Sequence, residues 1–213
     1  MSTIVALGDS TTRSVGLSGV SEQTAWQTLL EAELHRELGR PVKIINAGVD
    51  ADVAPLVWER LEKDVLRHNP DWVVINLGTN DAGYFRPPDS VADTPRVPLA
   101  VFAACMREII QHIADSGARV VLCTSVPMSG NYSLRDVPAY VENGLNYLVE
   151  QYAETTRELS REFGLPLVDI FAAFQQCPER DDMIPDGIHP NNMGQRLIAD
   201  TILPALRDVL GET

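Results

Sequence analysis

Basic residues are scarce in this sequence: 17 Lys and Arg stand against 30 Asp and Glu, and the formal net charge at pH 7 is −13. A polyanion such as nucleic acid would meet long-range repulsion from this charge, so a nucleic-acid partner is not expected. Anionic membrane surfaces are disfavoured for the same reason. The charge balance therefore argues against both classes of partner.

Cysteine is also scarce. Its three residues, Cys105, Cys123 and Cys177, form no CxxC pair, and the first two lie in apolar stretches where cysteine acts as a small hydrophobic side chain. Neither an HExxH nor an EF-hand pattern occurs, and the acidic residues Asp181, Asp182 and Asp186 match no metal-binding loop. The sequence thus predicts neither a disulfide framework nor a metal site, and we expect no cofactor.

Long hydrophobic runs, internal repeats and Gly/Ser-rich linkers are also missing. The apolar run at residues 4–7 is too short for a signal peptide or a membrane span, and no basic segment precedes it. A cytoplasmic protein without membrane insertion is therefore expected. The length of 213 residues, with 45% hydrophobic and 22% charged residues, suits a single globular domain over residues 1–213.

Short apolar segments rich in Val and Ile alternate with helical patterns along the chain. The expected buried strands are residues 4–7, 42–45, 72–77, 119–123 and 167–170. The expected helices are residues 26–38, 53–65, 98–113, 145–163 and 192–210. Strands joined by helical crossovers form a parallel sheet with helices on both faces. The predicted fold class is therefore α/β, a three-layer α/β/α sandwich around a five-stranded parallel sheet.

Two segments, residues 82–97 and 125–138, fit neither pattern. Each follows a predicted strand at the edge of the sheet where open α/β folds bind ligands. We therefore expect them to be substrate-shaping loops. Tyr84 and Phe85, which follow soon after the third strand, are candidate substrate-binding residues in the first of these loops.

Four short motifs follow predicted strands: Gly8-Asp9-Ser10, Asn46-Ala47-Gly48, Gly78-Thr79-Asn80-Asp81 and Asp186-Gly187-Ile188-His189. Because the carboxyl ends of parallel strands meet at one edge of a sheet, these segments are expected to converge. Together they resemble the SGNH hydrolases, also called the GDSL esterase/lipase family, whose four blocks correspond here to Ser10, Gly48, Asn80 and the pair Asp186 and His189. The resemblance spans nearly the whole chain and implies the flavodoxin-like strand order 2-1-3-4-5.

Ser10, His189 and Asp186 have the chemistry of a nucleophilic site. A serine hydroxyl becomes a competent nucleophile when a base takes its proton, and imidazole suits this role near neutral pH. Asp186 lies three residues before His189, close enough to hold the imidazole tautomer and to stabilise the imidazolium. We therefore predict Ser10 as the catalytic nucleophile, His189 as its base and Asp186 as the partner that orients the base.

The resemblance also implies an oxyanion hole. Its donors would be the backbone N–H groups of Ser10 and Gly48 and the side-chain amide of Asn80. A glycine at position 48 is also expected to let substrate approach the backbone closely. Asp9 and Asp81 are expected to orient their turns through side-chain to backbone hydrogen bonds, and neither is predicted to be catalytic.

The resemblance implies hydrolysis of a small-molecule carboxylic ester through an acyl-enzyme. Short acyl groups such as acetate, on a carbohydrate or a similar alcohol, are favoured because the chain is acidic and has no lipid-docking amphipathic segment. Lysophospholipase or thioesterase activity on longer acyl chains is the alternative. The fold and the catalytic residues by themselves do not choose between these substrates.

Other functional classes fit the sequence less well. The nucleophile elbow Gly-x-Ser-x-Gly of α/β-hydrolases is absent, and so is the glycine-rich phosphate loop that a phosphoryl-transfer enzyme would need. A catalytically silent module that binds glycans is the rival from a different class. The presence of all four sequence blocks favours the hydrolase over this rival.

Overall fold

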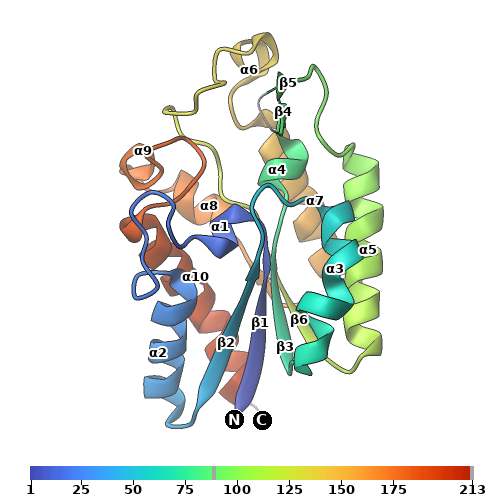
Figure 1. Ribbon diagram of the computed structural model, residues 1–213, viewed down its shortest axis with the longest axis vertical. Helices are drawn as coiled ribbons and strands as arrows, with labels where there is room; N and C mark the ends of the chain where they lie inside the picture. Colours follow the sequence, from blue (N-terminus) through green and yellow to red (C-terminus); the bar gives the residue numbers. More distant parts are fainter. Residues whose placement is uncertain (88–89, 212–213) are drawn as a thin grey trace.

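The computed structural model describes residues 1–87 and 90–211, and its centre is a five-stranded sheet in the order β2-β1-β3-β6-β7 (Figure 1). All four strand pairs are parallel. The strands are β1 Ser2–Gly8, β2 Val42–Gly48, β3 Trp72–Asn76, β6 Arg119–Cys123 and β7 Leu167–Val168. The predicted parallel sheet and the strand order implied by the resemblance are both confirmed.

Helices cover both faces of the sheet, so the predicted three-layer sandwich is confirmed (Figure 1). Successive residues of a strand point to opposite faces. In β1, Val5 and Leu7 pack with one set of helices and Ile4 and Ala6 with the other. The first set is α3 Ala54–Asp64, α5 Leu99–Asp115 and α7 Tyr147–Phe163; the second is α2 Trp26–Leu38, α8 Ile170–Gln175 and α10 Asn192–Gly211.

The long helices begin and end close to the predicted residues because their stop signals act locally. Gly39 and Gly164, which follow α2 and α7, both adopt the left-handed conformation that glycine reaches without strain. Strand β7 is shorter than predicted: the Asp169 side chain accepts a hydrogen bond from the N–H of Ala172 and caps α8, which begins at Ile170. The capping bond therefore ends the strand two residues early.

The segments predicted as substrate-shaping loops lie at the carboxyl edge of the sheet, where Figure 1 also shows the shortest helices. Residues 82–97 contain a small antiparallel hairpin of β4 Phe85–Arg86 and β5 Ser90–Val91, and residues 88 and 89 of this segment lie outside the described residues. The second segment leads into α6 Pro138–Asn143. The remaining short helices are α1 Ser10–Arg13, α4 Thr79–Ala82, α9 Arg180–Met183 and the 3₁₀ turn η1 Leu66–His68.

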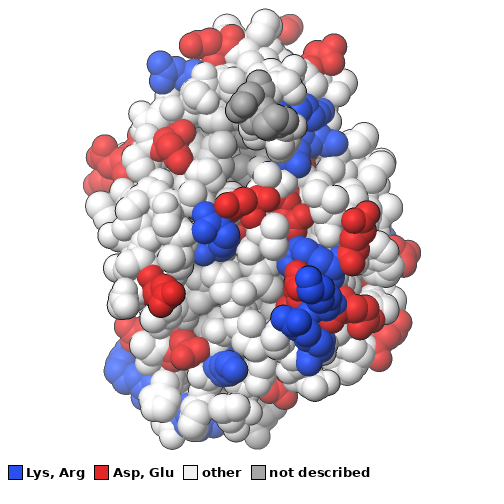
Figure 2. All heavy atoms as spheres, in the orientation of Figure 1, with Lys and Arg blue, Asp and Glu red and all other residues white. Residues whose placement is uncertain are grey.

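The surface of the molecule carries mixed charge. On the face shown in Figure 2, Lys and Arg side chains lie among Asp and Glu side chains, so the net charge of −13 does not form one acidic surface there. Within the described ranges, no helix combines the length and the apolar character needed to cross a bilayer.

Candidate active site

Ser10 is the first residue of α1, and Asp9 alone separates it from the end of the buried strand β1. The Asp9 side chain caps this short helix by accepting a hydrogen bond from the N–H of Thr11 at 2.8 Å. The Ser10 side chain lies 2.9 Å from His189, measured from Oγ to Nε2. A turn built from the second and third residues of the Gly-Asp-Ser motif therefore presents the hydroxyl to the imidazole.

His189 and Asp186 form the rest of a continuous chain of hydrogen bonds. His189 Nδ1 lies 2.7 Å from Asp186 Oδ2, and the other carboxylate oxygen accepts the backbone N–H groups of Ile188 and His189 at 3.0 and 2.7 Å. Burial alone would raise the pKa of Asp186, but the hydrogen bonds from His189 and Ile188 outweigh it and lower the pKa to about 2. An ionised carboxylate only accepts, so Nδ1 carries the proton and Nε2 is left to accept from Ser10.

The loop that carries Asp186 and His189 is held by residues 125–138, the second of the segments predicted to shape the substrate site. The N–H of Ser129 donates to the carbonyl of Gly187 at 3.0 Å, and its hydroxyl donates to the carbonyl of Ile184 at 2.7 Å. Gly187 has φ +95°, and the backbone of Tyr132 occupies the space where a Cβ would lie. Residues 125–138 therefore hold the loop that carries the imidazole.

Asn80 lies in α4, next to Ser10 as expected for the ends of neighbouring strands. Its Nδ2 donates to Asp9 Oδ2 at 3.2 Å. A pocket of about 230 Å³ opens above these residues, and it is lined by Ser10, Leu17, Asp50, Ala51, Asn80, Phe85, Ile188 and His189. Asp50 also forms an ion pair with Arg13, which neutralises the one carboxylate among the lining residues. The pocket wall is thus mainly apolar around the Ser10 hydroxyl.

Gly48 lies elsewhere than the sequence predicted. It is absent from the lining of this pocket, and its N–H donates to the Asn46 side-chain oxygen at 2.9 Å. The backbone of Thr12 and Arg13 occupies the space where a Cβ of Gly48 would lie. The close approach that requires a glycine at this position is therefore that of α1, the helix carrying Ser10, and not that of a substrate.

Ala51 is a pocket residue that the sequence did not indicate. It lies three residues beyond Gly48 and adopts φ +58°, a left-handed conformation that is uncommon for alanine and concentrates at functional sites. The turn around it is closed by the N–H of Asp52, which donates to the carbonyl of Val49 at 3.3 Å. Alanine has no polar side chain to mark it in a sequence, so this position becomes visible only in three dimensions.

Asp9 makes the turn-orienting hydrogen bond expected of it, to the N–H of Thr11, whereas the side chain of Asp81 bonds to the backbone of a distant segment. Asp81 Oδ1 accepts the N–H of Ala54 at 2.9 Å and so ties α4 to the start of α3. Burial raises the pKa of Asp81 to about 7, and burial also raises the pKa of Asp9 above its ordinary value. Asp9 in addition contacts Asn80, a link that the sequence did not predict.

The two candidate substrate-binding residues are placed differently. Phe85 lines the pocket above Ser10, whereas Tyr84 is buried and outside its lining. The Tyr84 hydroxyl forms a hydrogen bond with the Tyr147 hydroxyl, and its ring packs edge-on against Tyr140 at a centroid distance of 5.0 Å. Tyr84 is therefore part of the packing beneath the hairpin, and Phe85 alone of the pair borders the candidate site.

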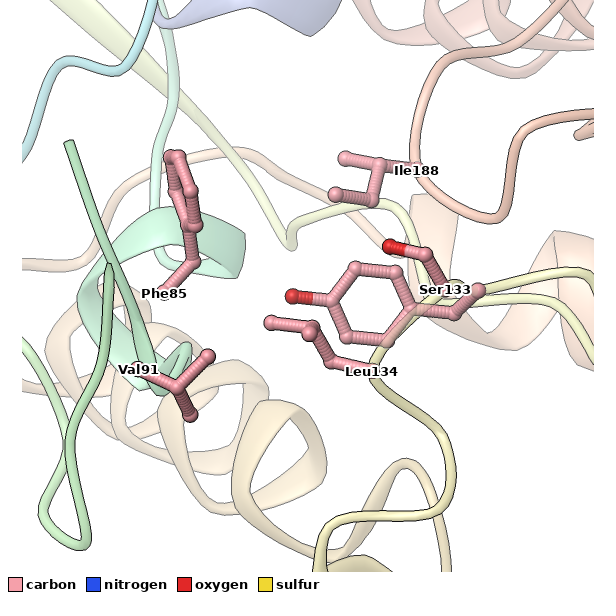
Figure 3. Close-up of a pocket in the computed structure, with 6 residues that line it drawn as sticks. Phe85, Val91, Ser133, Leu134 and Ile188 are labelled. Atoms are coloured by element: carbon pink, nitrogen blue, oxygen red, sulfur yellow. The ribbon is translucent and has the colours of Figure 1, made fainter. Parts of the chain in front are cut away.

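A second chamber of about 350 Å³ adjoins this pocket (Figure 3). Its lining residues are Phe85, Val91, Tyr132, Ser133, Leu134 and Ile188. Phe85 and Ile188 line both spaces. Figure 3 shows Phe85 and Val91 on one side of the chamber, facing Leu134, Ser133 and Ile188 on the other. Both predicted loops thus contribute to a largely apolar space that adjoins the pocket containing Ser10.

Among the described residues, no group of three or more His, Cys, Asp or Glu side chains could hold a metal ion. Cys105, Cys123 and Cys177 are free thiols.

A parallel sheet with serine, histidine and aspartate hydrogen-bonded in series at its carboxyl edge has the geometry of a serine hydrolase. Comparison with known proteins makes the assignment specific: residues 6–197 match the sequence profile of the GDSL-like lipase/acylhydrolase family, and the chain belongs to this family. The resemblance inferred from the four sequence blocks is thereby confirmed.

Individual relatives are similar over different shares of their length. Thioesterase 1/protease 1/lysophospholipase L1 of Escherichia coli K12 is 25% identical over 208 residues, covering 98% of this chain and 85% of that protein. An acetylxylan esterase of Xylanibacter ruminicola is 27% identical over 193 residues, but the chain spans only 38% of its length. The crystal structure of the lipase/acylhydrolase from Enterococcus faecalis has the same fold, with a TM-score of 0.77 at 24% identity over 98% of this chain and 97% of that chain.

Proposed function

We propose that the protein hydrolyses carboxylic esters in two steps, with Ser10 as nucleophile, His189 as general base and acid, and Asp186 as its orienting partner. Ser10 Oγ attacks the ester carbonyl while its proton moves to His189 Nε2. The bond to the alcohol then breaks, His189 protonates the departing oxygen, and an acyl-enzyme remains. Water, deprotonated by the same imidazole, releases the acid and restores the Ser10 hydroxyl.

The observation that carries this proposal is the series of two hydrogen bonds from Ser10 Oγ to His189 Nε2 and from His189 Nδ1 to Asp186, at 2.9 and 2.7 Å. The first bond places the base within reach of the proton it must take. The second keeps the imidazole in the tautomer that can accept that proton. An ionised Asp186 also stabilises the imidazolium that forms during attack.

Charge on the carbonyl oxygen is proposed to be stabilised by three donors: the N–H of Ser10, the amide of Asn80 and the N–H of Ala51. Ala51 takes the place that the sequence assigned to Gly48. The N–H of Gly48 is already bonded to Asn46, whereas no acceptor for the N–H of Ala51 occurs among the described residues. Ala51 also lines the pocket beside Ser10 and Asn80. Each donor in such a site contributes about 2.7 to 4 kcal/mol.

A covalent transition-state analogue distinguishes the N–H of Ala51 from the N–H of Gly48 as the oxyanion donor. Reaction of Ser10 with a 4-nitrophenyl alkylphosphonate places a phosphoryl oxygen where the carbonyl oxyanion forms. In a crystal structure of this adduct, we expect the phosphoryl oxygen to lie about 2.7 to 3.1 Å from the backbone nitrogen of Ala51. Contact with the nitrogen of Gly48 instead, with its bond to Asn46 broken, would return the role to Gly48.

Activity is expected to fall with a single protonation as the pH is lowered. The depressed pKa of Asp186 keeps its carboxylate ionised above about pH 2, so this group does not titrate in the working range of the enzyme. Protonation of the imidazole then removes the base. Log kcat/KM for 4-nitrophenyl acetate should fall with a slope of one on the acid side of its maximum. A slope of two, or a rate that does not fall as the pH is lowered, contradicts the assignment.

Two substrate classes fit the site. The first is an acetyl-type ester of a carbohydrate or similar alcohol, which is supported by the small volume of the pocket at Ser10 and by the similarity to a protein named acetylxylan esterase. The second is an ester or thioester with a longer acyl chain. It is supported by the apolar chamber beyond Phe85 and Ile188, and by the similarity to a protein named thioesterase and lysophospholipase. Whether an acyl chain occupies this chamber therefore distinguishes the two substrate classes.

Filling the chamber should separate the two classes. Val91 is 47% exposed at its rim, so Val91→Trp adds a large side chain there without disturbing the core. If long acyl chains occupy the chamber, this variant is expected to lower kcat/KM for 4-nitrophenyl octanoate about tenfold or more and to leave acetate and butyrate unchanged. Val101→Trp, at a similarly exposed position on α5, is the matched control. An acetate preference in the unmodified protein, with no effect of Val91→Trp, supports the carbohydrate ester.

A further inference from the structure

The carboxylate of Asp9 is buried, and its two oxygens serve two different parts of the site. Oδ1 accepts the N–H and the hydroxyl of Thr11, both at 2.8 Å. Oδ2 accepts Nδ2 of Asn80 at 3.2 Å. Asp9 is only 1% exposed. One side chain thus joins the turn that presents Ser10 to the amide that follows β3.

The orientation of the Asn80 amide matters because its two ends have opposite polarity. With Nδ2 toward the site, one N–H bonds to Asp9 and the second is free for an oxyanion. With the amide rotated by half a turn, its carbonyl oxygen would face both the Asp9 carboxylate and the developing negative charge. Asp9 Oδ2 can only accept when ionised, so it bonds to one orientation and repels the other.

We propose that Asp9 is a positioning residue for catalysis, which holds the Asn80 amide in the orientation that donates to the oxyanion. This inference depends on the proposed role of Asn80 in the oxyanion hole. It goes beyond the capping of α1, because the cap uses Oδ1 and the contact with Asn80 uses Oδ2. The two roles of Asp9 are therefore separable by substitution.

The substitution Asp9→Asn separates the capping of α1 from the contact with Asn80. Asparagine caps helices as well as aspartate does, and its oxygen is required at the Oδ1 position to accept the N–H of Thr11. Its NH₂ group must then face Asn80, where it offers a donor to the carbonyl oxygen of the amide. The substitution therefore favours the rotated, non-productive orientation of Asn80. Because losing one oxyanion donor costs about 10²- to 10³-fold in kcat, we expect Asp9→Asn to lower kcat about 10- to 100-fold with little change in KM.

A double-mutant cycle with 4-nitrophenyl acetate tests the inference. Asp9→Asn is expected to lower kcat strongly in the unmodified protein and to have almost no further effect in the Asn80→Ala background, where no amide remains to be oriented. An equal loss in both backgrounds would overturn the inference and indicate that Asp9 acts through the fold or through its charge near His189. If Asn80→Ala itself leaves kcat unchanged, it is the proposed oxyanion role of Asn80 that fails.

Two further readouts distinguish positioning from a structural role. The pH at which activity is half-maximal should be the same in Asp9→Asn as in the unmodified protein, because a shift would indicate an electrostatic effect on the base. The melting temperature of Asp9→Asn should change little, whereas Thr11→Val, which removes a hydroxyl bound to Oδ1, should lower it.

If Asp9→Asn does not fold, ¹⁵N NMR of the unmodified protein tests the orientation of the Asn80 amide. On phosphonylation of Ser10, one side-chain proton of Asn80 should shift strongly and the other little, and two unshifted protons overturn the inference.

Discussion

Ser10→Ala is expected to lower kcat/KM for 4-nitrophenyl acetate by about four to six orders of magnitude, because the variant has no hydroxyl to attack the ester carbonyl. The residual rate would come from the oxyanion donors and from binding alone. Initial rates with 4-nitrophenyl acetate, butyrate and octanoate measure the loss, and circular dichroism verifies the fold. Retention of the unmodified rate in the variant would remove Ser10 as nucleophile, and an unreactive serine in the unmodified protein would favour the silent glycan-binding module.

Ser14→Ala is the matched control for this variant. Ser14 directly follows α1 and is buried, but its hydroxyl has no hydrogen-bond partner among the described residues. Removing such a hydroxyl leaves no partner unsatisfied, so the free energy of unfolding should change little. We expect Ser14→Ala to keep the full rate, which would show that the loss in Ser10→Ala comes from the chemistry of one hydroxyl and not from disturbance of the turn.

Gly187→Ala is expected to lower kcat/KM at least about 100-fold and to destabilise the fold by about 2 to 4 kcal/mol. A residue with a side chain is strained at φ +95°, and the new Cβ would also overlap the backbone of Tyr132. Backbone cannot swing away as the end of a flexible side chain can, so the loop with Asp186 and His189 must move. A displacement of about 1 Å at a reacting group can cost 100-fold in rate.

Gly144→Ala separates conformational strain from overlap. Gly144 also has φ +95°, but no atom lies within 4 Å of the position its Cβ would take. This control should therefore lose only about 1 kcal/mol, or about 2 to 4 °C in Tm, and keep its activity. Equal losses of stability and activity in the two variants would mean that Tyr132 does not hold the catalytic loop in place. Thermal melts and rates on the same preparations provide the comparison.

Features that depend on local sequence patterns were predictable, and features that depend on packing between distant segments were not. The apolar runs of β1 and β3, the helical spacing of α2 and the glycines that end helices all act within a few residues. The hairpin β4–β5 has strands of only two residues each, too short to leave a periodic pattern. The early end of β7 depends on a single capping side chain, Asp169.

The candidate site shows the same division. Ser10, Asn80, Asp186 and His189 are marked by their side chains and by the strands they follow, and the structure brings them together. Gly48 was assigned to the oxyanion hole from the resemblance, whereas the structure explains a glycine there by the close approach of α1. A pocket residue such as Ala51 contributes its backbone, and backbone groups leave no signature in a sequence. Tyr84 and Phe85 are adjacent in the sequence, yet Tyr84 is buried beneath the hairpin and Phe85 lines the pocket.

Ser10 and His189 are separated by 179 positions in the chain, yet their side chains are hydrogen-bonded. During synthesis, the nucleophile is therefore made long before the base, and α10, which covers one face of the sheet, follows the base. Esterase activity should therefore be the last property acquired by a nascent or refolding chain, appearing only when residues 125–138 have docked and hold the loop of Asp186 and His189. The rate of ester hydrolysis would then report complete folding sensitively, because collapsed but incompletely folded chains would have no esterase activity.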